Sequence, residues 1–165
     1  MTFLGLGSNM GDKYANLMFA LDELSKHPHI WIRKKSFIYE SKPMYVHNQP
    51  NYYNMVIEID TNFEPFELLD YIKKIEIKSG RTASKIKNMP RTLDIDILAI
   101  DDLLIRSDVL NIPHIYIKDR RFVLKPWLDI APDYILSSEK KSIAYLLKHT
   151  SDMSKLNLIL ETEKN

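Results

Sequence analysis

The sequence predicts an α+β protein in which helices pack against an antiparallel sheet. Segments with strand character and segments with helical periodicity follow one another in the order β-α-β-β-α-β, and no internal repeat interrupts them. The length of 165 residues suits a single domain over 1–165, because one domain takes about 100 to 200 residues. The composition, 45% hydrophobic and 27% charged, excludes a disordered or fibrous chain.

The first half of the chain supplies a strand, a helix and a second strand. The apolar run Phe3–Leu6 predicts a strand that enters a glycine-rich turn over residues 7–11. Asp12 can cap the helix that follows, and this helix ends before Pro28. Residues 30–39 are rich in β-branched and aromatic side chains and predict one strand.

The next three elements complete the pattern. Apolar and polar residues alternate over 52–60, which predicts a third strand. A second helix begins at Pro65 and stops at Gly80, a residue type that often ends helices. Residues 93–100 form a nearly continuous apolar strand, which we expect at a central position covered on both faces.

The remaining residues, from about 103 onward, are too few for an independent core. They predict a short strand, a segment punctuated by prolines and a helix near 142–148, which together form a C-terminal extension of the same domain. The βαββαβ order is that of ferredoxin-like folds, in which two helices cover one face of the sheet.

Several classes of protein are excluded or disfavoured by composition. The chain has no cysteine, so it has neither disulfides nor thiolate metal sites. Its longest apolar runs are far shorter than the roughly 20 residues that span a bilayer, and its first residues do not resemble a signal peptide. We therefore expect a cytoplasmic protein with no membrane partner.

The net charge of +1 conceals an uneven distribution. Between residues 73 and 91 there are seven basic residues and one acidic residue, which favours an anionic ligand bound at one place. A solvated helix face followed by a charged loop would give the same pattern. The connections 42–51 and 80–92 are longer than usual, which is typical of loops that close over a ligand, although plain surface loops are the alternative.

The segment 90–97, Pro-Arg-Thr-Leu-Asp-Ile-Asp-Ile, contains the strongest candidate site. Residues two apart on a strand share a face, so Asp94 and Asp96 should point to one place. Two adjacent carboxylates repel each other unless a cation lies between them, and Mg²⁺ with substrate phosphates would supply it. Arg91 and Arg81 could contact phosphate oxygens in bidentate fashion. A solvated strand end is the commoner explanation of such a pair taken alone.

Other candidate residues are less specific. Gly5, Gly7 and Gly11 miss the dinucleotide-binding spacing by one residue, and a tight turn explains them. His114 follows a proline and precedes Arg120 by a few residues, so it could lie near a phosphate. Aromatic and amide side chains could hold a planar heterocycle, although each aromatic taken singly is more often a core residue; these are Tyr52, Asn54 and Phe122.

Together these features resemble the 6-hydroxymethyl-7,8-dihydropterin pyrophosphokinase family of folate biosynthesis. The matching segments follow the family's order along nearly the whole chain, and the most specific of them is Pro90–Asp96. The segments are Gly7–Asn9, Gln49–Asn54, Glu76 through Arg81, Pro90–Asp96, Pro113–His114, Arg120 with Phe122, and Ile130–Pro132.

The resemblance implies an ATP-dependent enzyme that transfers diphosphate to the pterin alcohol and releases AMP. Asp94 and Asp96 would bind two Mg²⁺ ions, and Arg81 and Arg91 would stabilise the transferred charge. Tyr52 and Phe122 would enclose the pterin and Asn54 would bind its edge, while His114 and Arg120 would lie on the nucleotide side. The length of the chain suggests no fused pathway domain.

Two alternatives come from other classes of protein. A small RNA-binding α+β protein could use the basic 73–91 segment to follow a phosphate backbone, but adjacent carboxylates would repel RNA. A protein that only binds pterin would need neither the carboxylate pair nor both arginines. We therefore expect no nucleic-acid partner.

Overall fold

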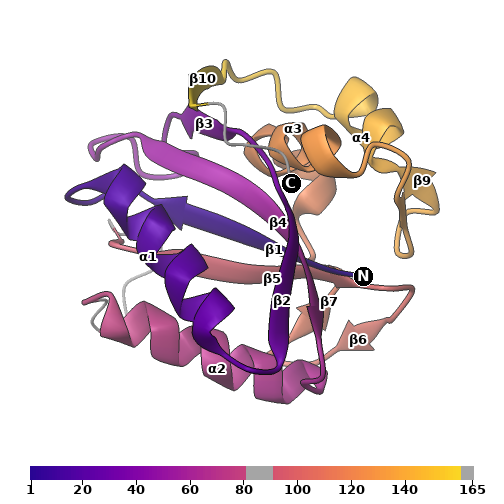
Figure 1. The fold of residues 1–165 in the computed structure, drawn as a ribbon. Helices are drawn as coiled ribbons and strands as arrows, with labels where there is room; N and C mark the ends of the chain where they lie inside the picture. Colours follow the sequence, from indigo (N-terminus) through magenta and orange to yellow (C-terminus); the bar gives the residue numbers. More distant parts are fainter. Residues whose placement is uncertain (81–90, 161–165) are drawn as a thin grey trace.

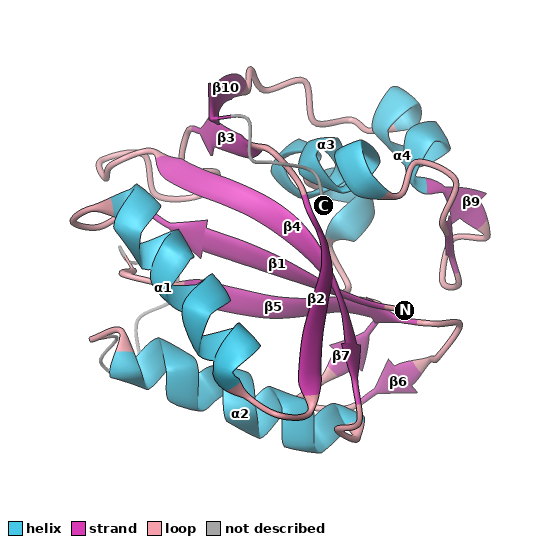
Figure 2. Ribbon diagram, viewed as in Figure 1, coloured by secondary structure: helices cyan, strands magenta, loops and turns pink. Residues whose placement is uncertain are grey.

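A six-stranded antiparallel sheet forms the centre of the protein, with helices on both of its faces (Figures 1 and 2). The computed structural model describes residues 1–80 and 91–160. The elements in chain order are β1 (Thr2–Ser8), α1 (Lys13–Lys26), β2 (Ile30–Lys35), β3 (Ile38–Ser41), β4 (Tyr52–Thr61), α2 (Pro65–Lys78), β5 (Asp94–Ile100), β6 (Ile105–Arg106), β7 (Asn111–Ile112), η1 (Ile117–Asp119), α3 (Arg121–Ile130), β8 (Ile135–Leu136), β9 (Lys141–Ser142), α4 (Ile143–His149) and β10 (Asn157–Leu160).

The strand order confirms the predicted ferredoxin-like arrangement. The sheet runs β10-β3-β4-β1-β5, and β2 also pairs with β4. Every pairing in it is antiparallel. β1 therefore lies between β4 and β5, and Gly7 near the end of β1 lies beside Asn54 of β4 and Asp94 of β5.

Local sequence signals explain where the first two helices begin and end. The side chain of Asp12 accepts a hydrogen bond from the Ala15 N–H at 3.0 Å, as expected of a residue that caps α1. Pro65 is the first residue of α2, where its missing N–H costs nothing. Gly80 has a φ of +100°, a conformation that glycine adopts without strain.

Each face of the sheet has its own apolar core. On one face, α1 and α2 cover a cluster that includes Leu4, Leu6 and Ile95. On the other face, α3 and α4 cover a second cluster built around Phe3 and Trp127. Figure 1 shows the two pairs of helices on opposite sides of the sheet. The second pair comes from the C-terminal extension, which packs against the sheet.

The prediction of a single strand over 30–39 is wrong. The chain breaks at Ser36 and Phe37, and β2 and β3 pair with different parts of β4. The Ser36 hydroxyl takes the place of a backbone acceptor at the break, because it accepts a hydrogen bond from the Val56 N–H at 2.9 Å. This bend lets the edge of the sheet turn toward α3, where Asp129 accepts from the Phe37 N–H at 3.2 Å.

Three further expectations were wrong or incomplete. β5 is covered on both faces, but it lies at the end of the strand order and not at its centre. The proline-punctuated segment contains the helix α3, although Pro126 lies inside it. Its fully buried Trp127 offsets the hydrogen bond that the proline removes. β10, which pairs with β3, was not predicted.

No helix in the described parts of the chain is long and apolar enough to cross a membrane.

Candidate active site

A pocket of about 150 Å³ opens between the α3 face of the sheet and the segment 42–49. Gly5 and Gly7 of β1 form part of its floor. Gly5 lies opposite Val56 of β4 and Asp96 of β5, and Gly7 lies opposite Asn54 and Asp94. Because opposed residues of neighbouring strands share a face, the two glycines leave space between the polar side chains of β4 and β5.

Asp94 and Asp96 line this pocket together with Arg91. An Arg91 Nη1 atom lies 3.2 Å from the Asp94 Oδ1 atom. None of the described residues forms an ion pair with Asp96 within 4.0 Å. Burial, reinforced by repulsion from Asp94, raises the pKa of Asp96 to about 7, although Arg120, Lys73 and Arg91 oppose this shift.

The two carboxylates suit a hard divalent cation that is shared with a substrate. No group of three or more His, Cys, Asp or Glu residues that could hold a metal is found within 1–80 and 91–160. A cation here would therefore complete its shell with water and phosphate oxygens, as Mg²⁺ commonly does. Its charge would also relieve the repulsion that raises the pKa of Asp96.

Arg120 supplies a positive charge to the same pocket. Its guanidinium carbon lies 5.0 Å from the centre of the Tyr116 ring and 5.7 Å from that of Phe122. Its Nε atom is buried and has no hydrogen-bond partner among the described residues. An arginine held between two rings in this way keeps donors available for an anion.

Tyr52, Asn54 and Phe122 line the other part of the pocket. The Asn54 amide nitrogen donates to the Ser41 hydroxyl at 2.8 Å. This bond directs the amide nitrogen toward Ser41, and the Oδ1 atom lies on the side of Gly7. Asn54 therefore offers an acceptor in a pocket that two aromatic side chains also line, which suits the N–H edge of a planar heterocycle.

The structure brings seven of the nine predicted site residues to one pocket. The seven are Arg91, Asp94, Asp96, Tyr52, Asn54, Phe122 and Arg120. His114 is not among the residues that line the pocket. Burial, followed by the charge of Arg120, lowers its pKa to about 4, so the ring is neutral at pH 7. Arg81 lies outside the described residues.

The basic 73–91 segment is only partly directed at the pocket. Lys73 forms an ion pair with Glu76 at 3.1 Å, and Lys78 forms one with Glu23 at 2.9 Å. Of its described basic residues, only Arg91 lines the pocket. The part of the segment that lies in α2 is therefore a solvated helix face whose lysines form ion pairs, which was the alternative explanation of the basic cluster.

Sequence reasoning missed several residues of the site. Gly5 and Gly7 were interpreted as turn residues, but both lie within β1 and form the floor of the pocket. Ser41, which orients Asn54, gave no signal in the sequence. Part of the predicted loop 42–51 forms a wall; the lining residues there are Lys42, Pro43, Met44, Tyr45 and Gln49.

Fold and pocket together define a ferredoxin-like domain whose site combines paired carboxylates, arginines and an aromatic slot. Residues 3–132 match the family described as 7,8-dihydro-6-hydroxymethylpterin-pyrophosphokinase (HPPK). The chain belongs to this family, as the resemblance predicted.

Relatives of known name agree with this assignment. A 2-amino-4-hydroxy-6-hydroxymethyldihydropteridine pyrophosphokinase from Aquifex aeolicus is 41% identical over 133 residues, covering 81% of each chain. The Folic acid synthesis protein FOL1 of Dictyostelium discoideum is 39% identical over 96% of this chain, and the bifunctional protein FolKE of Lactococcus lactis subsp. lactis is 42% identical over 88%. The RNA-binding alternative finds no support in these matches.

Some relatives are much longer than the matched region. The chain spans 22% of the Dictyostelium protein and 42% of the Lactococcus protein. A crystal structure of Plasmodium falciparum HPPK-DHPS has a TM-score of 0.69 at 17% identity, covering 89% of this chain and 43% of that one, which shows the shared fold. The absence of a fused pathway domain from this protein stays a prediction.

Proposed function

We propose that the chain transfers the diphosphate group of ATP to 6-hydroxymethyl-7,8-dihydropterin, releasing AMP, in the cytoplasm. The pterin hydroxyl oxygen would form a bond to the β-phosphorus, the bond from that phosphorus to the oxygen of the α-phosphate would break, and the hydroxyl proton would be released. The observation that carries this proposal is one pocket with a carboxylate pair, two arginines and an aromatic slot.

In this proposal the aromatic part of the pocket holds the pterin. Tyr52 and Phe122 would enclose its rings, and the Oδ1 atom of Asn54 would accept hydrogen bonds from its N–H edge. The floor at Gly7 leaves room for the rings, because a Cβ atom there would lie 3.5 Å from Asn54 Oδ1 and 3.8 Å from Tyr52 Cδ1. Shape and hydrogen bonding would thus place the hydroxymethyl group near Asp94 and Asp96.

The charged part of the pocket would hold the triphosphate. Asp94 and Asp96 would bind two Mg²⁺ ions, which when bound neutralise phosphate charge. Arg91 and Arg120 would contact phosphate oxygens, and the unpaired Nε donor of Arg120 supports that role. His114, neutral and next to Arg120, is proposed on the nucleotide side. Arg81 is proposed to stabilise the transferred charge, as the resemblance implies.

Catalysis by these residues would consist of positioning and charge stabilisation. No side chain here needs to form a covalent intermediate, because phosphoryl transfer depends mainly on alignment and on compensation of charge. Closure of the pocket by the segment 42–51 would keep water from the reacting phosphorus. Most of the second predicted closing loop, 80–92, lies outside the described residues.

The test is formation of AMP by the purified protein with ATP and Mg²⁺, with and without the pterin alcohol. We expect AMP and pterin diphosphate in equal amounts only when all three are present, and no AMP when EDTA removes the metal. AMP formed without the pterin would indicate a hydrolase. No AMP under any condition, with salt-sensitive RNA binding, would favour the alternative.

A further inference from the structure

Asn9, the residue after β1, connects two walls of the pocket without lining it. Its side chain is fully buried. Its Oδ1 atom accepts from the Arg91 N–H at 2.7 Å, and its own N–H donates to the Arg91 carbonyl at 3.1 Å. Its Nδ2 atom donates to Gln49 Oε1 at 2.8 Å and to the Pro50 carbonyl at 3.2 Å. One small side chain therefore holds two segments that are far apart in sequence.

The orientation of this amide is fixed by its partners. The Arg91 N–H can only donate, so the atom facing it must be the oxygen of Asn9. The Pro50 carbonyl can only accept, so the atom facing it must be the nitrogen. Aspartate would lose the donated bonds, and serine is too short to reach both segments, so asparagine is specifically suited to this position.

Both segments that Asn9 holds contribute to the pocket. Arg91 lines it and reaches Asp94 at 3.2 Å. Gln49 lines the opposite wall, and its Nε2 atom donates to the Val46 carbonyl at 2.9 Å, which steadies the segment 43–46. The distance between the arginine and this wall therefore depends on the side chain of Asn9.

We propose that Asn9 is a positioning residue that sets the separation between Arg91 and the wall at residues 43–49, and thereby aligns the two substrates for transfer. This inference rests on the proposed function, because the proposed function is what assigns the two substrates to the two walls. Asn9 touches neither substrate, so it acts through Arg91 and Gln49.

A matched control lies seven residues away. Asn16 lies in the first turn of α1. Like Asn9 it is an asparagine whose side chain donates hydrogen bonds, in this case from Nδ2 to Ser8 Oγ at 3.0 Å and to the Met10 carbonyl at 2.8 Å. These side-chain bonds stay within residues 8–16 and reach neither wall of the pocket. Asn16→Ser therefore removes a similar number of hydrogen bonds from the same turn without changing the separation of the walls.

The first experiment compares Asn9→Ser with Asn16→Ser in melting temperature and steady-state kinetics. For Asn9→Ser we expect kcat to fall about tenfold or more, since small misplacements of reacting groups are costly. KM for the pterin alcohol should rise about fivefold, because the binding site is no longer preorganised. For Asn16→Ser both constants should stay within about twofold at a comparable loss of stability. Equal kinetic losses in the two variants would overturn the proposal.

The second experiment is a double-mutant cycle between Asn9 and Gln49. If Asn9 acts on the wall through Gln49, then Gln49→Ala should also raise KM for the pterin alcohol. The fold-increase in KM of the double variant should then be smaller than the product of the fold-increases of the two single variants. Multiplicative effects would show that the two residues act separately and would contradict the proposed link.

Calorimetric binding of the pterin alcohol separates this proposal from the proposed function. A parent protein that binds the pterin alcohol but forms no AMP would refute the transfer reaction, while the comparison of Asn9→Ser with Asn16→Ser could still be made by affinity. Weaker binding by Asn9→Ser alone would support the positioning role. Equal binding by both variants, or binding by neither variant nor the parent, would refute it.

Discussion

Where β1 and β5 border the pocket, the two faces of the sheet are filled in opposite ways, although the same strands build both. On the α1–α2 face, β1 presents Leu4 and Leu6 and β5 presents Ile95 and Ile97 to a closed apolar core. On the α3 face the intervening residues are the glycines of β1 and the aspartates of β5, which line the pocket. On these strands the alternation directs one set of side chains into the first apolar core and the other set into the pocket, which lies on the same face as the second core around Phe3 and Trp127. Stability of the first core and ligand binding should therefore be separable by mutation.

The largest expected effect is a loss of activity on the pocket face. Asp96→Asn should lower turnover by about 100-fold or more, because it removes a proposed metal ligand while keeping the side chain's shape. The exposed strand residue Asp60, whose carboxylate lies 2.6 Å from Arg33 Nε, provides the control. Asp60→Asn should leave turnover within about twofold. Full activity of Asp96→Asn would place the metal site elsewhere.

The same variant should not lose stability when metal is absent. The pKa of Asp96 is raised to about 7, above the value of about 3.9 expected in an unfolded chain. The native state therefore holds this proton more tightly, so its stability falls as the pH rises through the interval between these values. In EDTA at pH 8, Asp96→Asn should melt at or above the temperature of the parent, and this advantage should shrink toward pH 5. A lower melting temperature at pH 8 would contradict the raised pKa.

The second effect is a loss of stability on the closed face. Ile72 of α2 is fully buried in the first core. Ile72→Ala should lower the free energy of unfolding by about 2–5 kcal/mol, and Ile72→Val by about 0.5–1.5 kcal/mol. Urea denaturation measures both values. KM and kcat per folded molecule should not change, and a change in either would show that the two faces are coupled.

A smaller effect concerns the floor of the pocket. A Cβ atom at Gly7 would make ordinary contacts, so Gly7→Ala should fold normally. Gly7→Val adds two methyl groups toward Asn54 and Tyr52 and should weaken binding of the pterin alcohol by about tenfold, with a lesser effect from alanine. Isothermal titration calorimetry measures the affinity. Equal affinities for all three proteins would mean that the pterin lies away from Gly7.

The regular parts of this structure could be predicted from sequence because their signals are local. Asp12 and Pro65 mark helix starts, and the two-residue spacing of Asp94 and Asp96 places both on one face. The residues that meet in the pocket are far apart in sequence, so no local pattern groups them. The family resemblance predicted that they act together.

The rest depends on contacts between distant residues. Asn9 meets Gln49 and Arg91, which are 40 and 82 residues away in sequence, so the short segment Gly7–Asn9 does not indicate what its side chain holds. A glycine suits a turn and a pocket floor equally well, and only the pairing of β1 with β4 and β5 decides between them. Pro126 hid the helix α3, because the burial that stabilises this helix is tertiary.

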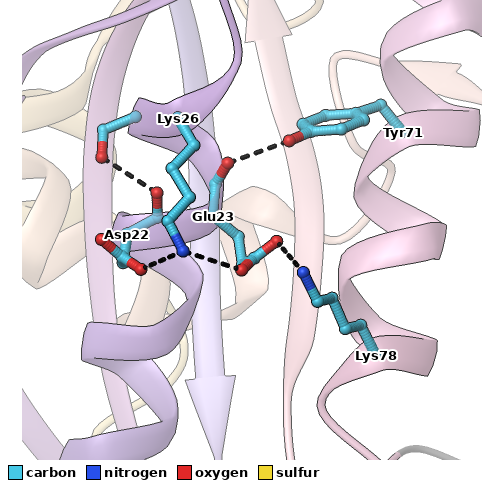
Figure 3. A network of polar contacts seen from close by, with 6 residues as sticks. Asp22, Glu23, Lys26, Tyr71 and Lys78 are labelled. Atoms are coloured by element: carbon cyan, nitrogen blue, oxygen red, sulfur yellow. Dashed lines mark hydrogen bonds and ion pairs between the residues drawn. The ribbon is translucent and has the colours of Figure 1, made fainter.

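The smallest effect should come from the polar network that joins α1 to α2 at the rim of the closed face (Figure 3). Glu23 of α1 forms ion pairs with Lys78 of α2 at 2.9 Å and with Lys26 at 3.4 Å. The Tyr71 hydroxyl donates to the Glu23 carbonyl at 2.9 Å. Because the two lysine side chains are each 62% exposed, solvent and salt weaken these pairs, and their contribution to stability is small.

Glu23→Gln should therefore lower the melting temperature by only a few degrees at pH 7 and leave kinetics unchanged. The hydrogen bond from Lys78, with the charges of both lysines, lowers the pKa of Glu23 below 4.5 despite the opposing effect of burial. A lowered pKa contributes stability at pH values above the unfolded value, and this contribution is lost as the pH falls through the folded value. The difference in melting temperature between parent and variant should accordingly vanish in acid and shrink in high salt. A difference that persists in acid would show that Glu23 acts through packing and not through its charge.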